Sequence, residues 1–289
     1  MAVVVDAQTL FARFFDFDDQ TASVVGINVA GLPVGLLFDN PAVAEQARRD
    51  YAPFLSDDEP LTRVRIHVDG RVYLGDDLEI GEVGPAIDET VEQVIVAWRG
   101  YVLVADKTWR NPRVVLRSGC GAVENVLRII YSFLILEHDG FLLHSSGVER
   151  DGAGIVFFGK SGSGKTTAAR LSAPYQVLSD DMIAITRRNG GFVAWGTPFG
   201  EVDKAGRQNR STPLRGLFLL KQSPETSVEP LARREFVTHL MANVVTFTSN
   251  LDRQATILDL CRALSLKIDG AMLHFRRDPS FWEVIVNAP

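Results

Sequence analysis

The feature that most constrains the fold of this 289-residue chain is the segment Gly159–Thr166. It fits the pattern G-x-x-x-x-G-K-[ST], in which a glycine-rich loop joins a buried strand to a helix and cradles a phosphate. A strand-like apolar run, Gly154–Phe158, precedes the loop, and a helical segment, Lys165–Leu171, follows it. This context favours a nucleotide-binding loop over a flexible surface loop and predicts an α/β core.

Each residue type in the loop has a physical role. Glycines adopt positive φ, which lets successive backbone N–H groups point toward one phosphate. The Lys165 ammonium can reach the β- and γ-phosphates, the Thr166 hydroxyl can coordinate Mg²⁺, and the helix directs its positive end at the nucleotide. We therefore expect ATP and Mg²⁺ to bind through Gly159, Ser161, Gly162, Ser163, Gly164, Lys165, Thr166 and Thr167.

Two adjacent carboxylates, Asp180 and Asp181, follow the short apolar run Gln176–Leu178 and so mark the end of a strand. In phosphate-loop proteins one carboxylate at such a position holds Mg²⁺, and a second can accept the proton of an attacking hydroxyl. Neighbouring strand side chains point to opposite faces, so both can serve one site only if a turn redirects one of them. A solvated Asp-Asp turn is the alternative.

His144 follows the apolar strand Phe141–Leu143, just before the strand that leads into the loop. If these two strands are neighbours in one sheet, His144 and Lys165 share the edge at which open α/β sheets bind ligands. A packed or hydrogen-bonded structural histidine is the competing interpretation.

A charged stretch between two strands supplies further candidates. Arginines there could clamp phosphate oxygens or recruit an acidic acceptor, although a solvated charged loop explains the same residues equally well. The candidates for acceptor or phosphate contacts are Glu201, Arg207, Arg210 and Arg215.

The patterning predicts two domains, a strand-rich one over residues 1–118 and a nucleotide-binding one over residues 119–289. The formal net charge is −8 for residues 1–117 and +2 for residues 118–289, so an anionic ligand is expected in the second domain. In the first domain we expect strands at Ser23–Val29, Val34–Phe38, Thr62–Val68, Val91–Val96 and Tyr101–Ala105, and a helix at Pro41–Phe54.

In the second domain, apolar residues at helical spacing predict a helix from Ala122 to about His138. Asn189-Gly190-Gly191 predicts the turn of a hairpin. Besides the strands already named, we expect strands at Met182–Thr186, Phe192–Trp195, Leu217–Leu220, Ala271–Phe275 and Trp282–Val286, and helices at Arg233–Val245 and Gln254–Leu266.

Composition excludes several classes of function. A formal net charge of −6 argues against general nucleic-acid or anionic-membrane binding. Two distant cysteines, Cys120 and Cys261, can form neither a disulfide framework nor a cysteine zinc site. The N-terminus lacks a basic segment and a cleavage site, and the apolar stretch Val126–Leu143 is interrupted by charges, so we expect a cytoplasmic protein.

With these residues in view, residues 122–289 resemble the HPr kinase/phosphorylase superfamily, and its shorter HPr-kinase-like members in particular. The resemblance rests on the segments Leu142–Val148, Phe158–Thr167, Leu178–Asp181 and Leu214–Leu217. It implies a core similar to HPr kinase and ATP-dependent phosphoenolpyruvate carboxykinase. It also implies that Asp180 is the catalytic base, that Asp181 is a metal or loop partner, and that His144 tunes the base.

The sequence departs from that family at two places. Pro213 stands where the family signature has a glutamate, and the Pro-Gly-Arg-Asn segment of the C-terminal region is missing. Both elements are tied to phosphorylase activity and HPr docking, so the resemblance does not carry those properties over. The shorter relatives include lasso-peptide and other natural-product enzymes that phosphorylate a serine of a precursor peptide, which adds a peptide to the expected acceptors.

The leading hypothesis is an ATP- and Mg²⁺-dependent kinase that phosphorylates a serine-type hydroxyl of a peptide, small protein or small molecule. Asp180, His144 and Lys165 are its expected catalytic residues, and Thr166 and Asp181 its metal ligands. The alternative is a non-catalytic nucleotide-binding regulator that acts through a protein partner, and a slow NTPase or carboxykinase-like enzyme ranks third. The sequence leaves the oligomeric state open, with a homo-oligomer among the options.

Overall fold

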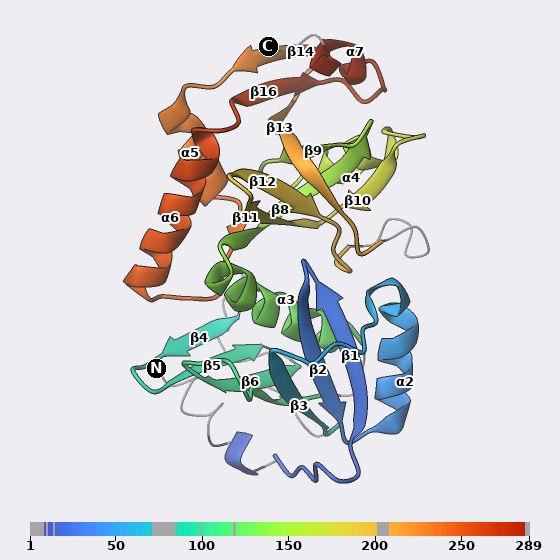
Figure 1. The fold of residues 1–289 in the computed structure, drawn as a ribbon, viewed down its shortest axis with the longest axis vertical. Coiled ribbons are helices and arrows are strands. Elements are labelled where there is room, and N and C mark those ends of the chain that lie inside the picture. Colours follow the sequence, from blue (N-terminus) through green and yellow to red (C-terminus); the bar gives the residue numbers. More distant parts are fainter. Residues whose placement is uncertain are drawn as a thin grey trace. The chain divides into compact units, whose positions relative to one another are not determined.

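The computed structural model describes residues 9, 11–13, 15–70, 85–98, 100–117, 120–200 and 208–286. The chain forms two compact units, Met1–Leu134 with Phe247–Asn250, and Ile135–Thr246 with Leu251–Pro289. Each unit contains one sheet and helices, so the chain is a mixed α/β protein, as the sequence predicts (Figure 1).

A seven-stranded sheet forms the first unit. Its strands are β1 (Ser23–Val29), β2 (Leu32–Phe38), β3 (Thr62–Val68), β4 (Ala86–Glu89), β5 (Gln93–Trp98), β6 (Tyr101–Asp106) and β7 (Arg113–Leu116). They lie in the order β1-β2-β3-β7-β6-β5-β4. The predicted helix at Pro41–Phe54 ends earlier, at Asp50, because the chain turns at Tyr51 and continues as the 3₁₀ turn η1 (Ala52–Phe54) after α2 (Pro41–Asp50).

A nine-stranded sheet forms the second unit. Its strands are β8 (Gly140–Arg150), β9 (Ala153–Phe158), β10 (Gln176–Ser179), β11 (Met182–Arg188), β12 (Gly191–Trp195), β13 (Ser211–Gln222), β14 (Ser227–Pro230), β15 (Val244–Val245) and β16 (Gly270–Phe275). The main order is β10-β8-β11-β12-β13-β16-β14, while β9 pairs with both β8 and β13, and β15 pairs with β8. β13 runs parallel to β9 and β16, whereas β8 is antiparallel to β9.

Helices cover both faces of this second sheet. They are α4 (Lys165–Arg170), α5 (Arg233–Met241), α6 (Leu251–Ser265), α7 (Phe281–Val286) and the end of α3 (Cys120–Glu137). Strand side chains alternate between the two faces, so Phe158 packs with Phe236 and Leu260 in one core cluster, and Phe157 packs with Phe281 in the other. α5 and α6 pack against each other (Figure 1).

The structure corrects the predicted end of the strand before His144. β8 does not stop at Leu143 but continues to Arg150. The polar residues do not end the strand because their side chains are satisfied inside the fold: the hydroxyl of buried Ser145 donates to the Leu143 carbonyl, and that of buried Ser146 donates to the Lys165 carbonyl.

Two predictions near the C-terminus were also wrong. The segment predicted as a strand at Trp282–Val286 is helix α7, because Phe281, Trp282 and Ile285 fall on one helical face and are buried against the sheet. The helix predicted to reach Val245 ends at Met241, and β15 instead pairs with β8.

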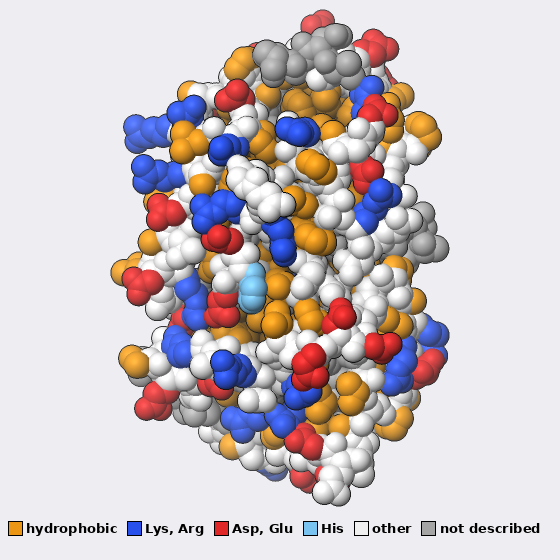
Figure 2. Space-filling view, viewed as in Figure 1, with side chains coloured by type: hydrophobic (Ala, Val, Ile, Leu, Met, Phe, Trp, Pro, Cys, Tyr) orange, Lys and Arg blue, Asp and Glu red, His pale blue; other side chains and the backbone are white. Residues whose placement is uncertain are grey.

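The described residues include no helix with both the length and the apolar character needed to cross a bilayer. On the face seen in Figure 2, acidic and basic side chains are interspersed in both units rather than gathered into a patch of one sign.

In the first unit, the carboxylate of Glu89 joins β4 to a distant segment of the chain. Its side chain is only 2% exposed. One carboxylate oxygen lies 3.0 Å from the Lys107 ammonium, and the other accepts hydrogen bonds from the Thr248 hydroxyl and from the Ser249 and Asn250 amides. Burial pushes the pKa of Glu89 up, but these hydrogen bonds and Lys107 outweigh it, so the pKa is lowered from its ordinary value.

Glu89→Gln is expected to make local opening of the segment around Thr248, Ser249 and Asn250 more frequent. Removing the charge weakens charge-assisted hydrogen bonds by about 1–3 kcal/mol, so exchange of the Ser249 and Asn250 amides at pH 7 should accelerate by roughly tenfold or more. Because the folded-state pKa of Glu89 is lowered, its stabilisation is present above the ordinary pKa of about 4.3 and is lost as the pH falls through the folded-state value. The difference between the two proteins should therefore shrink in acid. Hydrogen exchange measures it, with exposed Glu92→Gln as the control; equal exchange in both variants at pH 7 would contradict the assignment.

Candidate functional site

The glycine loop, Gly159–Gly164, joins buried β9 directly to α4, as the sequence predicts. Gly159, Gly162 and Gly164 all have positive φ, at 141°, 78° and 108°. A side chain at Gly164 would also come within 3.1 Å of the Phe275 ring. The loop therefore takes a folded path that only glycine adopts at low energy.

Lys165, the first residue of α4, turns its side chain back into the loop. The residue is 7% exposed, and its ammonium donates to the carbonyls of Gly159 (2.8 Å) and Lys160 (3.2 Å). Burial lowers the pKa of Lys165, and the nearby Asp181 carboxylate opposes that shift. The ammonium is thus stripped of water and is placed to gain from any anion that enters the loop.

Hydrogen bonds from neighbouring strands hold the loop in place. The Ser146 hydroxyl, on β8, donates to the carbonyl of Lys165 (2.7 Å), and the Gln222 amide, at the end of β13, donates to the carbonyl of Gly162 (2.6 Å). Among the described residues, the buried hydroxyl of Ser163 has no hydrogen-bond partner.

Asp180 and Asp181 form the connection between β10, which ends at Ser179, and β11, which begins at Met182. β10 has therefore ended before the two aspartates, which is the condition under which both carboxylates can face one site. Asp180 is 5% exposed. Gly200 lies directly against it, since a Cβ at Gly200 would sit 2.1 Å from the Asp180 Oδ1.

His144 lies on β8, opposite Met182 of β11. Its Nδ1 is 3.2 Å from Oδ1 of Asp181, and its backbone amide donates to the carbonyl of Asn243 (2.8 Å). The side chains of His144 and Asp181 are 38% and 24% exposed. The histidine is therefore half-open to solvent and contacts the second aspartate, not only the core.

These elements enclose one cleft of about 310 Å³. The residues that line it are His144, Ser161, Gly162, Gly164, Lys165, Thr166, Thr167, Asp180, Asp181 and Arg277. Gly159 and Ser163 belong to the loop without lining the cleft. The cleft thus combines a buried cation, two carboxylates and a histidine.

Arg277 is the lining residue that sequence reasoning missed. It follows β16, whose carboxyl end meets those of β9 and β13 because the three strands are parallel. The available signal was a pair of arginines, Arg276 and Arg277, directly after the last strand.

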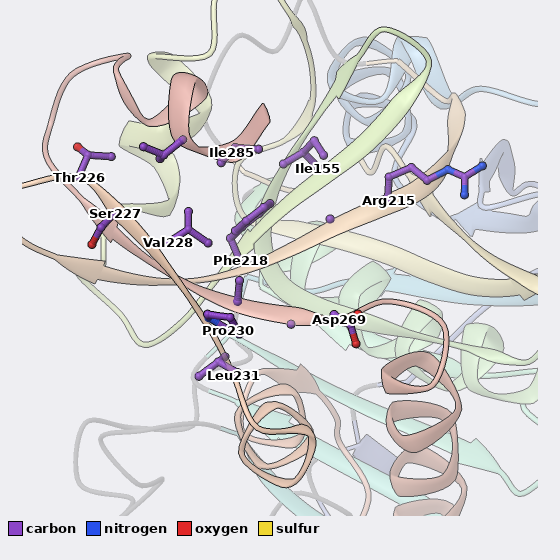
Figure 3. A pocket seen from close by; sticks show the side chains of 14 residues that line it. Ile155, Arg215, Phe218, Thr226, Ser227, Val228, Pro230, Leu231, Asp269 and Ile285 are labelled. Carbon is purple, nitrogen blue, oxygen red and sulfur yellow. The ribbon is translucent and has the colours of Figure 1, made fainter. Parts of the chain in front are cut away.

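The two described candidates of the charged stretch, Arg210 and Arg215, do not line the cleft. Arg210 pairs with Glu149, at 2.9 and 3.0 Å. Arg215 lies near the amino end of β13 and lines another pocket, of about 600 Å³, where its guanidinium points away from Phe218 (Figure 3). Glu201 and Arg207 lie outside the described residues.

The donor set of the cleft fits Mg²⁺. Thr166 offers a hydroxyl and Asp181 a carboxylate, which are the hard oxygen ligands that this ion prefers. No group of three or more His, Cys, Asp or Glu side chains suited to a metal occurs within the described part of the chain.

Fold and site together define an α/β protein in which a glycine loop, a buried lysine and two aspartates face one cleft. A family model described as "SynChlorMet cassette protein ScmC" matches residues 118–265, about half of the chain, and the chain belongs to that family. The structure of the Hpr(Ser) kinase/phosphatase from Coxiella burnetii matches with 14% identity and a TM-score of 0.29, over 50% of this chain and 93% of that one. No curated protein matches the chain.

Gly200→Ala is expected to displace the Asp180 carboxylate. The added Cβ would overlap Oδ1, so the substitution should destabilise the fold by about 1–3 kcal/mol more than a Gly→Ala change at an uncrowded position of positive φ. Gly190→Ala is the matched control, because its φ is 76° and no atom lies within 4 Å of its Cβ position. Denaturant unfolding of the full chain measures the difference, and equal losses in the two variants would show that Asp180 is not held against Gly200.

Proposed function

We propose that this protein is an ATP- and Mg²⁺-dependent kinase that transfers the γ-phosphate to a serine-type hydroxyl of a peptide, a small protein or a small molecule. The proposal places catalysis in residues 119–289 and the reaction in the cytoplasm. The observation that carries it is the meeting of the buried Lys165 ammonium with Asp180 and Asp181 in one cleft. The sequence resemblance of residues 122–289 to the HPr-kinase-like proteins supports the same activity.

Phosphoryl transfer depends mainly on positioning and on neutralising charge. The loop amides and the Lys165 ammonium would bind the β- and γ-phosphates. Thr166 and Asp181 are the residues that would hold Mg²⁺, which supplies further positive charge at the phosphates when it is bound. Arg277 lines the same cleft and adds a cation that can reach phosphate oxygens.

Asp180 is assigned the role of base. The acceptor oxygen forms a bond to the γ-phosphorus, the bond between that phosphorus and the bridging oxygen breaks, and ADP leaves. The acceptor proton passes to the Asp180 carboxylate. Because Nδ1 of His144 lies 3.2 Å from Asp181, the histidine is assigned to orient that aspartate, and through it the base.

Lys165→Ala should weaken MgATP binding by about 100-fold, because it removes charge-assisted contacts worth roughly 1.5–3 kcal/mol. Calorimetric titration of the full chain measures the dissociation constant. Lys160→Ala is the control, because this lysine is exposed on the same loop and does not line the cleft. Wild-type affinity in Lys165→Ala would remove the proposed function.

The two aspartates should respond differently to substitution. Asp180→Asn is expected to lower kcat by about 10²–10⁴-fold while MgATP binding stays within a few-fold, since it removes only the proton acceptor. Asp181→Asn should instead raise the Mg²⁺ concentration that half-maximal activity requires. Transfer from γ-labelled ATP to a panel of serine-containing peptides and small alcohols measures both, with exposed Asp151→Asn as the control.

If Asp181→Asn lowers kcat and Asp180→Asn raises the Mg²⁺ requirement, then Asp181 is the base and Asp180 the metal ligand. Wild-type protein that binds MgATP tightly but labels no member of the panel would favour the regulator over the kinase. Full activity in both aspartate variants would exclude the mechanism.

A further inference from the structure

The order of strands gives the cleft two distinct sides. Along the sheet, β9 lies between β8 and β13, and β16 follows β13. The glycine loop leaves the carboxyl end of β9, while His144 on β8 and the aspartates that precede β11 lie on one side of it. The carboxyl ends of β13 and β16, at Gln222 and Phe275, lie on the other side.

This asymmetry sets the direction of a bound triphosphate. If the transferred phosphate faces the aspartates, as the proposed function requires, the rest of the nucleotide must extend toward β13 and β16. Ligands of open α/β sheets bind outside the carboxyl ends of the strands, which agrees with this direction.

A hollow of about 370 Å³ lies at that position. It is lined by Gln222, Ser223, Pro224, Phe275 and Arg277. Arg277 lines both this hollow and the cleft, so the two are adjacent. The volume falls in the range of small-molecule sites, roughly 300–1,000 Å³.

Residues that line the hollow also contact the glycine loop. The Gln222 amide donates to the Gly162 carbonyl at 2.6 Å, and the Phe275 ring lies 3.1 Å from the Cβ position of Gly164. The amide of Ser223 donates to the carbonyl of Phe275 at 3.1 Å, which joins the ends of β13 and β16. Hydrogen bonds and packing therefore fix the hollow and the glycine loop relative to each other.

The lining chemistry suits a nucleoside. Exposed Pro224 offers apolar surface for a flat base, and the exposed guanidinium of Arg277 can stack on a base or pair with a phosphate. Phe275 is 1% exposed and supports the hollow from the core beneath it. The Ser223 hydroxyl accepts from the Glu225 amide at 3.2 Å and keeps its proton to donate to a ribose oxygen. The Gln222 amide nitrogen donates to Gly162, and its amide oxygen can accept from a ribose hydroxyl. Among the residues that the structure describes, no carboxylate lines the hollow, which favours a ligand that continues into an anion.

We propose that the hollow lined by Gln222, Ser223, Pro224, Phe275 and Arg277 binds the nucleoside half of the nucleotide, while the glycine loop binds its phosphates. This inference rests on the proposed function, since it needs a triphosphate in the loop. Arg277 serves both halves, whereas Ser223 serves the nucleoside alone.

Comparing MgATP with inorganic tripolyphosphate, which has no nucleoside, tests the assignment. Dissociation constants of the full chain for both ligands are measured by calorimetry. In Ser223→Trp the indole fills the hollow, so affinity for MgATP should fall by about tenfold or more while affinity for tripolyphosphate stays within about twofold. Lys165→Ala and Arg277→Ala should weaken both ligands. Lys221→Trp, an exposed neighbour outside the hollow, is the control for the added indole.

The outcomes separate the two proposals. Wild-type protein that binds neither ligand overturns the proposed function and the nucleoside site together. If wild-type protein binds tripolyphosphate as tightly as MgATP, or if Ser223→Trp weakens both ligands equally, the loop still binds phosphate but the nucleoside site is wrong. Selective loss of MgATP affinity in Ser223→Trp, but not in Lys221→Trp, supports the assignment.

Discussion

The buried ammonium of Lys165 is the interaction on which the rest of the site depends. Two loop carbonyls hold it in place of water, and a carbonyl dipole compensates a full charge only in part. Burial accordingly lowers the pKa of Lys165. An anion that entered the loop would add to this partial compensation. Positive φ at Gly159 and Gly164 keeps the backbone wrapped around that position.

Strand direction decides what surrounds this cation. Because β9, β13 and β16 are parallel, the segments that follow them emerge at one edge. Because β8 is antiparallel to β9, its middle residues rather than its end reach the same edge, and this brings His144 beside the loop. The site is thus assembled from elements separated by more than 100 residues, and sheet pairing fixes their order.

The sequence predicts the local parts of this site well. The glycine loop and the aspartate turn follow from residue types that few other conformations explain, so both lie where expected. Arg277 could not be placed, because its position depends on the pairing of β16 with β13, which periodicity does not encode. Arg215 is a candidate through its charge and its place in the resembling segment Leu214–Leu217, but the parallel register puts it near the opposite end of β13.

Tertiary contacts also explain why two secondary-structure predictions were wrong. Polar residues normally mark the end of a strand, but β8 continues through Ser145 and Ser146 because the fold supplies acceptors for both buried hydroxyls. A six-residue apolar segment fits either a strand or a short helix, and α7 is a helix because its aromatic residues pack on Phe157. In both cases tertiary contacts overrode a local signal.

The two aspartates of the cleft, Asp180 and Asp181, have different neighbours. Carboxylates on consecutive residues repel each other when both are ionised, so the pair needs positive charge nearby. The Lys165 ammonium attracts Asp181, and Nδ1 of His144 lies 3.2 Å from Oδ1 of the same residue. Asp181 is therefore the aspartate with attractive contacts to the loop lysine and to the histidine of β8. Asp180 is instead confined against Gly200, which fixes its position relative to the cleft. The two carboxylates are therefore held by different neighbours, although they are consecutive in the chain.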